Sequence, residues 1–283
     1  MRPRALGRVA AAVALAASLV VAAAPAGADG DLQHDDASGL EFLEITTGGA
    51  TAGEALPIVI AIHGLGDNPD SFRLLLDDLP TRARVIFPRG PTPHGTDGFS
   101  WFDFRADDDD NQTELGKGIH ASSERLAKLI VSLSKARSGP DRVVVCGFSQ
   151  GGMLTFALAA EHPELVAEAI PISGFIPPSL WPPERPKTRP LPRVAALHGE
   201  ADKLVPVKKA RWSVDALKAN GYEASLRTWP GVGHALMPEI RAALEAAVMK
   251  AADELSQAGG VLPGPPAPKP AAPDDTPDRA AHP

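Results

Sequence analysis

The chain has 283 residues, of which 44% are hydrophobic, and its formal net charge is −7 at pH 7. This length and this apolar fraction suit one globular α/β domain with extensions at its ends. The negative charge argues against nucleic acid and anionic lipid surfaces as partners, because both would repel the protein. The single cysteine, Cys146, excludes an intrachain disulfide.

The first 28 residues have the pattern of a secretory signal peptide. Three arginines precede an apolar stretch at residues 9–24, and Ala26-Gly27-Ala28 provides the small residues of a cleavage site. The stretch is short for a transmembrane helix, although an uncleaved anchor is the alternative interpretation. We expect export to the periplasm or the extracellular medium and no stable membrane insertion after cleavage. Loss of the three arginines would leave a mature charge of −10.

The mature chain divides into a catalytic domain at residues 29–258 and a tail at residues 259–283. The tail holds eight prolines and almost no large apolar side chains. Such a segment cannot bury enough surface to offset the entropy of ordering, so the tail is predicted to be disordered.

The first strand signal that bears on function is the apolar run at residues 57–62. It leads into the loop His63-Gly64-Leu65-Gly66-Asp67, whose glycines let the backbone approach a substrate closely. Acyl transfer places negative charge on the former carbonyl oxygen, and fixed N–H donors must stabilise that charge. We therefore assign one donor of an oxyanion hole to the backbone N–H of Leu65. The alternative is an ordinary turn with a structural histidine.

A long connection separates the strand that ends at Pro88 from a helix predicted at residues 113–137. Connections of this length in a compact domain are usually functional. Four aromatic side chains lie in this one: Phe99, Trp101, Phe102 and Phe104. They form one wall of an acyl pocket or, alternatively, pin the loop to the core. Trp101 is our candidate for substrate binding.

The next apolar run ends in a Gly-x-Ser-x-Gly motif. The segment reads Val143-Val144-Val145-Cys146-Gly147-Phe148-Ser149-Gln150-Gly151-Gly152, and an Ala- and Leu-rich helical segment follows it. A sharp turn from strand to helix lifts the serine hydroxyl out of the sheet, where a base and a substrate can both reach it. Ser149 is therefore the candidate nucleophile, and the backbone N–H of Gln150 is the candidate second oxyanion donor.

Two later strands are each followed by a residue that would complete a catalytic triad. Residues 193–197 form an apolar run that leads to Asp202, and residues 224–229 lead to His234 on a glycine-rich loop. The order Ser, Asp, His is that of an α/β-hydrolase, in which the acid orients the base and the base activates the serine. Glu200 is the competing acid and His198 the competing base.

These motifs together resemble the phospholipase/carboxylesterase group of α/β-hydrolases, which includes acyl-protein thioesterases. The resemblance runs in order from about residue 40 to residue 256. It rests on His63-Gly64-Leu65-Gly66-Asp67-Asn68, Ser71-Phe72, Pro88-Arg89-Gly90-Pro91, Trp101-Phe102-Asp103, Gly147-Phe148-Ser149-Gln150-Gly151-Gly152, Ile172-Ser173-Gly174-Phe175-Ile176-Pro177, His198-Gly199-Glu200-Ala201-Asp202, Val205-Pro206 and Gly231-Val232-Gly233-His234. It implies the α/β-hydrolase fold, a mostly parallel central sheet flanked by helices.

The resemblance also implies hydrolysis of carboxylic or thio esters by Ser149, Asp202 and His234, without a metal or cofactor. We predict a secreted serine hydrolase that acts on small-molecule esters of short to medium acyl chains through an acyl-enzyme on Ser149. A serine peptidase, which would share the triad, is one alternative. A non-catalytic exported binding module on a hydrolase fold is the other. The leader, a Pro-rich insert at residues 177–192 and the tail depart from the compact family pattern.

Overall fold

A computed structural model of the chain describes residues 31–104, 112–182 and 190–258. The predicted leader, at residues 1–28, and the predicted tail, at residues 259–283, lie outside the described residues. No helix within the described ranges combines the length and the apolar character needed to cross a membrane.

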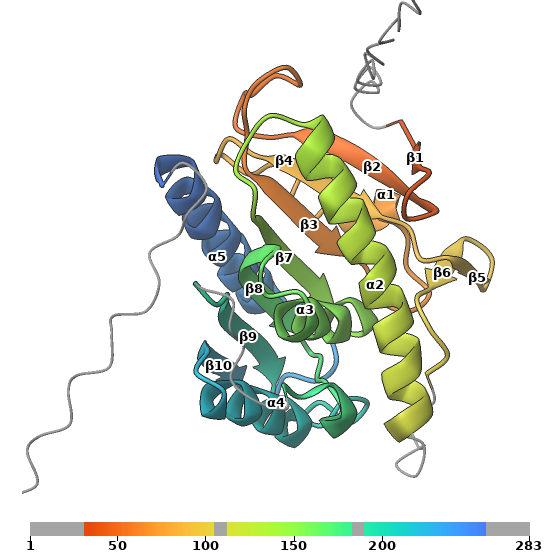
Figure 1. Cartoon of the computed structure of the whole chain (residues 1–283). Helices are drawn as coiled ribbons and strands as arrows, with labels where there is room; N and C mark the ends of the chain where they lie inside the picture. Colours follow the sequence, from red (N-terminus) through yellow and green to blue (C-terminus); the bar gives the residue numbers. More distant parts are fainter. Residues whose placement is uncertain (1–30, 105–111, 183–189, 259–283) are drawn as a thin grey trace, which may run out of the picture.

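An eight-stranded sheet forms the centre of the molecule, in the order β1-β2-β4-β3-β7-β8-β9-β10 (Figure 1). The six strands from β4 to β10 run parallel, while β2 is antiparallel to both of its neighbours. The strand bounds are β1 Gln33–Asp35, β2 Leu40–Thr46, β3 Ile58–Ile62, β4 Arg84–Pro88, β7 Val143–Phe148, β8 Val166–Ile172, β9 Arg193–Gly199 and β10 Glu223–Trp229. The predicted fold class, an α/β-hydrolase with a mostly parallel sheet, is confirmed.

Helices cover both faces of this sheet (Figure 1). One buried cluster joins one sheet face to α2 (Gln112–Ala136), α3 (Gln150–Glu161) and α4 (Val207–Ala219). A second joins the opposite face to α1 (Pro69–Arg73) and α5 (Pro238–Gln257). A parallel strand that is buried on both faces has a continuous apolar sequence. The apolar runs at residues 57–62 and 143–146 therefore predict buried strands.

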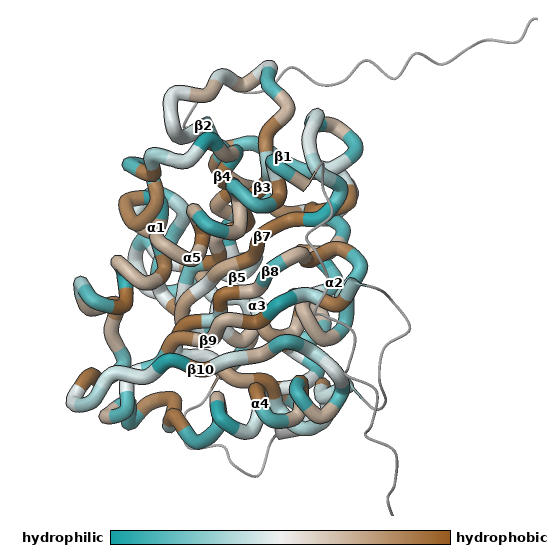
Figure 2. The backbone as a smooth tube through the Cα atoms, turned by 90° about the vertical axis from the view of Figure 1, so that its left-hand side faces the viewer, coloured by the Kyte–Doolittle hydropathy of each residue, from teal (hydrophilic) through white to brown (hydrophobic). Residues whose placement is uncertain are grey.

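The difference between central and edge strands is visible in the hydropathy of the chain. Figure 2 shows β7 in brown at the centre, whereas β10 at the edge is pale to teal. The strand β7 is buried along almost its whole length, but in β10 exposed residues alternate with buried or half-buried ones over most of the strand. Burial on one face only therefore gives β10 the period of two expected for an edge strand.

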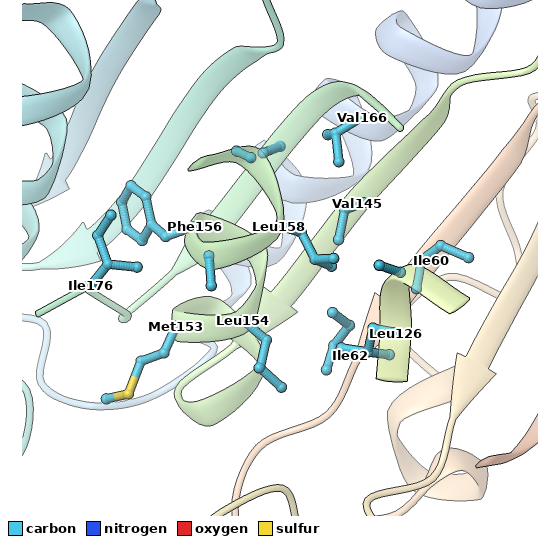
Figure 3. Close-up of a cluster of buried hydrophobic side chains, with 14 of the residues drawn as sticks. Ile60, Ile62, Leu126, Val145, Met153, Leu154, Phe156, Leu158, Val166 and Ile176 are labelled. Atoms are coloured by element: carbon cyan, nitrogen blue, oxygen red, sulfur yellow. The ribbon is translucent and has the colours of Figure 1, made fainter. Parts of the chain in front are cut away.

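The helix that follows the Gly-x-Ser-x-Gly motif is packed into the core. Leu154 and Leu158 of α3 point toward side chains of β3, β7 and α2, whereas Met153 and Phe156 lie on the side of α3 that faces Ile176 (Figure 3). These four residues are fully buried. Each such side chain stabilises the fold by roughly 1.5–3 kcal/mol relative to an exposed one. This packing holds the start of α3, and hence Ser149, in place.

Cys146 lies in β7 and is fully buried. Burial raises the pKa of its thiol to about 12. A thiol in this environment stays protonated and has no nucleophilic role.

A small antiparallel hairpin stands beside the main sheet in the long connection after β4. Its strands are β5 (Thr92–His94) and β6 (Gly98–Ser100), and a backbone bridge links Asp67 to Phe99. A short 3-10 helix, η2 (Pro178–Leu180), lies at the start of the Pro-rich insert. The hairpin places the segment after β4 against the loop that follows β3, where the candidate oxyanion donor lies.

Candidate active site

The three predicted catalytic residues lie at the carboxyl edge of the parallel sheet. Ser149 follows β7 directly, Asp202 lies on the loop after β9, and His234 lies on the loop after β10. Open α/β sheets gather their sites at this edge because every parallel strand ends there. Side chains that are far apart in the sequence are thus brought together.

Ser149 occupies a strained backbone position. Its φ is 57° and its ψ is −113°, a conformation that non-glycine residues rarely adopt. The neighbouring glycines make the turn sterically feasible, because a Cβ atom at Gly151 would collide with the carbonyl oxygen of Ile62. A backbone hydrogen bond of 2.9 Å from Ser149 N–H to Ile172 anchors the turn to β8. Strain of this kind persists only where the surrounding structure imposes it.

His234 links the serine to the aspartate. Its Nε2 lies 2.9 Å from Ser149 Oγ, and its Nδ1 lies 2.7 Å from Asp202 Oδ2. An ionised aspartate can only accept hydrogen bonds, so Nδ1 carries the proton and Nε2 is free to accept the serine proton. The ring of Phe148 packs against the imidazole with ring centres 4.9 Å apart. The arrangement is that of a nucleophile, a base and an orienting acid.

Asp202 is held in its ionised form by hydrogen bonds. Burial alone would raise the pKa of its carboxyl group, but bonds from His198, His234 and the Val205 N–H outweigh burial and hold the pKa well below its usual range. Its Oδ1 accepts from the backbone N–H groups of Leu204 at 3.0 Å and Val205 at 2.8 Å. These bonds leave Oδ2 to face His234.

Neither Glu200 nor His198, the competing acid and base, takes part in the chain of contacts from Ser149 to His234 and Asp202. Glu200 is exposed and accepts a hydrogen bond of 2.7 Å from the Thr228 hydroxyl. His198 is fully buried; its Nε2 lies 2.8 Å from the Val205 carbonyl oxygen and 3.4 Å from Asp202 Oδ2. Its ring therefore supports the aspartate and has no hydrogen bond to Ser149 in the described structure.

The two predicted oxyanion donors lie on either side of Ser149. Gln150 is the first residue of α3, where backbone N–H groups have no partner within the helix and the helix dipole favours negative charge. Leu65 lies on the loop after β3, and Gly64 approaches Ser149 so closely that an added Cβ would meet the Ser149 Cβ at 3.4 Å. Neither N–H donates to an acceptor among the described residues.

A cavity of about 320 Å³ opens above Ser149. It is mostly apolar, and its lining comes from the loops after β3, β7, β9 and β10 together with one residue of the long connection: Gly64, Leu65, Asp67, Phe104, Phe148, Ser149, Leu204 and His234. Within the described ranges, no group of three or more histidine, cysteine or acidic side chains is arranged to hold a metal ion.

A family comparison matches residues 49–249 to the family described as Phospholipase/Carboxylesterase. The chain belongs to the phospholipase/carboxylesterase family. The resemblance inferred from the motifs is confirmed, and the protein is an enzyme of the carboxylic ester hydrolase class.

Curated members of this family cover most of the domain. An acyl-protein thioesterase 1 of Gibberella zeae is 27% identical over 212 residues, which is 68% of this chain and 89% of the relative. Carboxylesterase SOBER1 of Arabidopsis thaliana is 27% identical over 205 residues, 64% of this chain and 85% of the relative. A protein of Oryza sativa subsp. japonica named a probable inactive carboxylesterase is 29% identical over 198 residues, 63% of this chain and 78% of the relative.

Solved structures share the fold at lower identity. Esterase PE8 has a TM-score of 0.62 at 23% identity, with coverage of 75% of this chain and 98% of that structure. Acyl-protein thioesterase 2 of Zea mays has a TM-score of 0.56 at 24% identity, with coverage of 74% and 98%. At these identities the structures are similar in fold alone.

The structure of this family member departs from one sequence prediction. Trp101 does not line the cavity at Ser149. Its side chain is buried, packs on His63 with ring centres 5.2 Å apart, and donates from Nε1 to the His63 carbonyl oxygen at 3.0 Å. It borders a separate cavity of about 840 Å³ beside α2, and Phe104 is the aromatic residue that borders both. The prediction of direct substrate contact therefore passes from Trp101 to Phe104.

Two features of the site were not predicted from the sequence. Phe148 and Leu204 line the cavity, and a signal existed for both, since each lies within three residues of a predicted catalytic residue. The side chain of Gln150 is also structural, because its amide binds the backbone at Trp101 and Phe102. No sequence signal marks that contact, because about 50 residues separate the partners.

Proposed function

We propose that this family member is a serine hydrolase that cleaves carboxylic esters, and thioesters by the same chemistry, through an acyl-enzyme on Ser149. The observation that carries the proposal is the relay Ser149–His234–Asp202, with contacts of 2.9 and 2.7 Å. A weak nucleophile, a base and an ionised acid are already aligned in it. Because His234 accepts from Ser149 and donates to Asp202, proton transfer needs no rearrangement.

The reaction follows from this arrangement in two halves. Ser149 Oγ attacks the ester carbonyl carbon while His234 Nε2 takes the hydroxyl proton. The tetrahedral intermediate collapses, the C–O bond to the alcohol breaks, and His234 returns the proton to the leaving oxygen. Water then attacks the acyl-enzyme with His234 as base, and the acid departs as Ser149 regains its proton.

The backbone N–H groups of Leu65 and Gln150 stabilise the charge that develops in both halves. They lie beside Ser149 and have no acceptor among the described residues, so a substrate oxygen can take both hydrogen bonds. Donors fixed in advance lower the barrier because nothing has to reorganise when the charge appears.

Substrate panels distinguish this function from the two alternatives. We expect purified protein to hydrolyse chromogenic esters and acyl thioesters but not peptide anilides. Hydrolysis of anilides at a rate comparable with esters would instead indicate a peptidase. The absence of turnover with every substrate, from folded protein, would indicate a binding module; the rice relative named inactive makes this arm necessary.

Acyl-chain length provides a prediction from the cavity. Its lining includes Leu65 and Leu204, which are 38% and 45% exposed, so its mouth is open to solvent. Each methylene buried in it contributes about 0.8 kcal/mol until the chain outgrows the space. We expect kcat/KM for p-nitrophenyl esters to rise through short chains, peak at short to medium length and then fall.

The same open mouth predicts no response to a lipid–water interface. The measurement is the rate with a long-chain ester as its concentration crosses the solubility limit. A smooth curve is expected. A steep rise at that limit would indicate a mobile lid and a true lipase, and would overturn the preference for short to medium acyl chains.

Export is the remaining part of the proposal, and it rests on the leader pattern at residues 1–28. We expect the mature protein to begin at Asp29, after the Ala26-Gly27-Ala28 signal. N-terminal sequencing of protein collected outside the cytoplasm checks this cleavage. A sequence that starts at Met1 in the exported protein would refute it.

A further inference from the structure

His63 is a buried histidine that takes no part in the relay. It is fully buried, and both of its ring nitrogens are hydrogen-bonded. Nε2 lies 3.0 Å from the backbone N–H of Gly90, and Nδ1 lies 2.7 Å from the carbonyl oxygen of Gly64. A backbone N–H can only donate, so Nε2 is an acceptor and the proton is on Nδ1. Burial lowers the pKa of this imidazole, which agrees with a neutral ring.

The Nδ1–H bond acts on the peptide group that carries an oxyanion donor. The Gly64 carbonyl and the Leu65 N–H belong to one planar trans peptide, so they point in opposite directions. The carbonyl is held by His63 Nδ1 and also by the backbone N–H of Asp67 at 3.3 Å. Any rotation of the carbonyl would turn the Leu65 N–H away from the substrate oxygen. The direction of the Leu65 N–H is therefore fixed by the hydrogen bonds that the Gly64 carbonyl accepts, and the shorter of them comes from the His63 ring.

A buried network connects the preceding peptide, between His63 and Gly64, to the residue that carries the second donor. The Trp101 indole donates to the His63 carbonyl oxygen at 3.0 Å, and the Trp101 backbone N–H donates to Gln150 Oε1 at 3.0 Å. The Gln150 amide nitrogen donates to the Phe102 carbonyl oxygen at 2.7 Å. The loop that carries Leu65 and the side chain of Gln150 are thus joined through one segment of the long connection.

We propose that His63 is a positioning residue that orients the Leu65 N–H of the oxyanion hole through its Nδ1–H bond to the Gly64 carbonyl. The inference rests on the proposed function, because an oxyanion hole has a role only if Ser149 attacks a carbonyl. His63 touches neither substrate nor nucleophile. It acts through the peptide between Gly64 and Leu65. The hydrogen bonds of Trp101 with His63 and Gln150 hold the loop after β3 in place relative to α3.

Two amide substitutions separate the roles of the two ring nitrogens. In His63→Asn the side-chain amide nitrogen is as many bonds from Cα as Nδ1 is, so the donor to Gly64 is retained. In His63→Gln the amide extends toward Gly90 and the donor to Gly64 is lost. We expect His63→Gln to lower kcat by about 10- to 100-fold with KM nearly unchanged, somewhat less than deletion of an oxyanion donor, which costs roughly 10²–10³-fold. His63→Asn should stay within a few-fold of wild type.

A second measurement tests the oxyanion hole itself. A trifluoromethyl ketone forms a tetrahedral oxyanion adduct with an active-site serine, so its inhibition constant should rise in His63→Gln in proportion to the loss of kcat. The acid limb of the pH profile of kcat/KM should stay in place, because His63 transfers no proton. If His63→Gln lowers only the melting temperature and the folded enzyme keeps its kcat, the role of His63 is structural and the proposal is wrong.

Failure of this inference can be told apart from failure of the proposed function. If Ser149→Ala is inactive while His63→Gln retains wild-type kcat and inhibitor affinity, only the positioning role is overturned. If Ser149→Ala retains activity, the nucleophile is wrong and the oxyanion hole at Leu65 is overturned with it. If both amide variants lose kcat equally, the donor at Nδ1 is not what matters, which also contradicts the proposal.

Discussion

Ser149→Ala should lower ester turnover by roughly 10³-fold or more, as the loss of a triad nucleophile does in serine hydrolases. The substitution removes only the hydroxyl group, so the residue keeps its Cβ atom and its place in the turn. The φ of 57° at residue 149 is a backbone strain, so we expect the wild type and Ser149→Ala to share it. The melting temperature should therefore change little. Steady-state kinetics with a chromogenic ester and a fluorophosphonate probe, which labels activated serines, measure the effect.

Ser173 provides a matched control for this variant. It too has a positive φ, 47°, follows a strand of the sheet and is fully buried. Its hydroxyl, however, has no hydrogen-bond partner among the described residues. Ser173→Ala should keep the turnover and the probe labelling of the wild type. Labelling that persists in Ser149→Ala, or that disappears in Ser173→Ala, would place the nucleophile elsewhere.

The position of each candidate catalytic residue could be predicted because each depends on a local pattern. An apolar run that stops at a glycine or a polar residue identifies the end of a parallel strand, and parallel strands end at one edge of the sheet. Ser149, Asp202 and His234 each follow such a run, so their proximity followed from topology without knowledge of any contact. Leu65 follows β3 at the same edge, so the place of the candidate oxyanion loop could be predicted in the same way.

The role of Trp101 could not be predicted because it depends on packing between distant segments. Phe99, Trp101, Phe102 and Phe104 are equivalent candidates in the sequence, and the β5–β6 hairpin decides which of them faces the cavity. The hairpin turns the indole of Trp101 toward His63 and leaves Phe104 at the cavity wall. The tautomer of His63 was equally hidden, since its partner Gly90 is 27 residues away.

A buried ion pair between β2 and β4 is another contact that could not be predicted from the sequence. Arg84 on β4 and Glu44 on β2 are 1% and 4% exposed and form a hydrogen-bonded ion pair, and Arg137 binds the same carboxylate at 2.9 Å. Buried charges are tolerated only when they are paired. A sequence shows each charge but not the antiparallel register, in which Arg84 faces Thr46 and so lies diagonally across from Glu44, 40 positions away in the chain.

Asp202→Asn should lower turnover on the order of 10⁴-fold, because it places the wrong tautomer of His234 beside Ser149. The backbone N–H groups of Leu204 and Val205 bind Oδ1. Those donors would keep the amide oxygen of the variant on their side and turn its NH₂ group toward His234. The imidazole would then have to accept at Nδ1 and carry its proton on Nε2, where it can no longer take the proton of Ser149.

Glu200→Gln is the matched control, since it makes the same change of a carboxylate to an amide two residues away. Glu200 is exposed and its carboxylate accepts only from Thr228 among the described residues, at 2.7 Å. Its turnover should remain within a few-fold of wild type. A crippled Glu200→Gln enzyme beside a nearly normal Asp202→Asn enzyme would show that the carboxylate was misassigned.

The free energies of unfolding of the wild type and of Asp202→Asn should also depend differently on pH. The pKa of Asp202 in the folded protein is held well below that of an ordinary aspartate, which is about 3.9. A carboxyl group with a lowered folded pKa stabilises the fold above its unfolded pKa, and that contribution is lost as the pH falls toward the folded pKa. The free energy of unfolding of the wild type should therefore fall more steeply below about pH 4 than that of Asp202→Asn. Parallel curves from pH 6 to pH 2.5 would show that no such ionised carboxylate is held at this site.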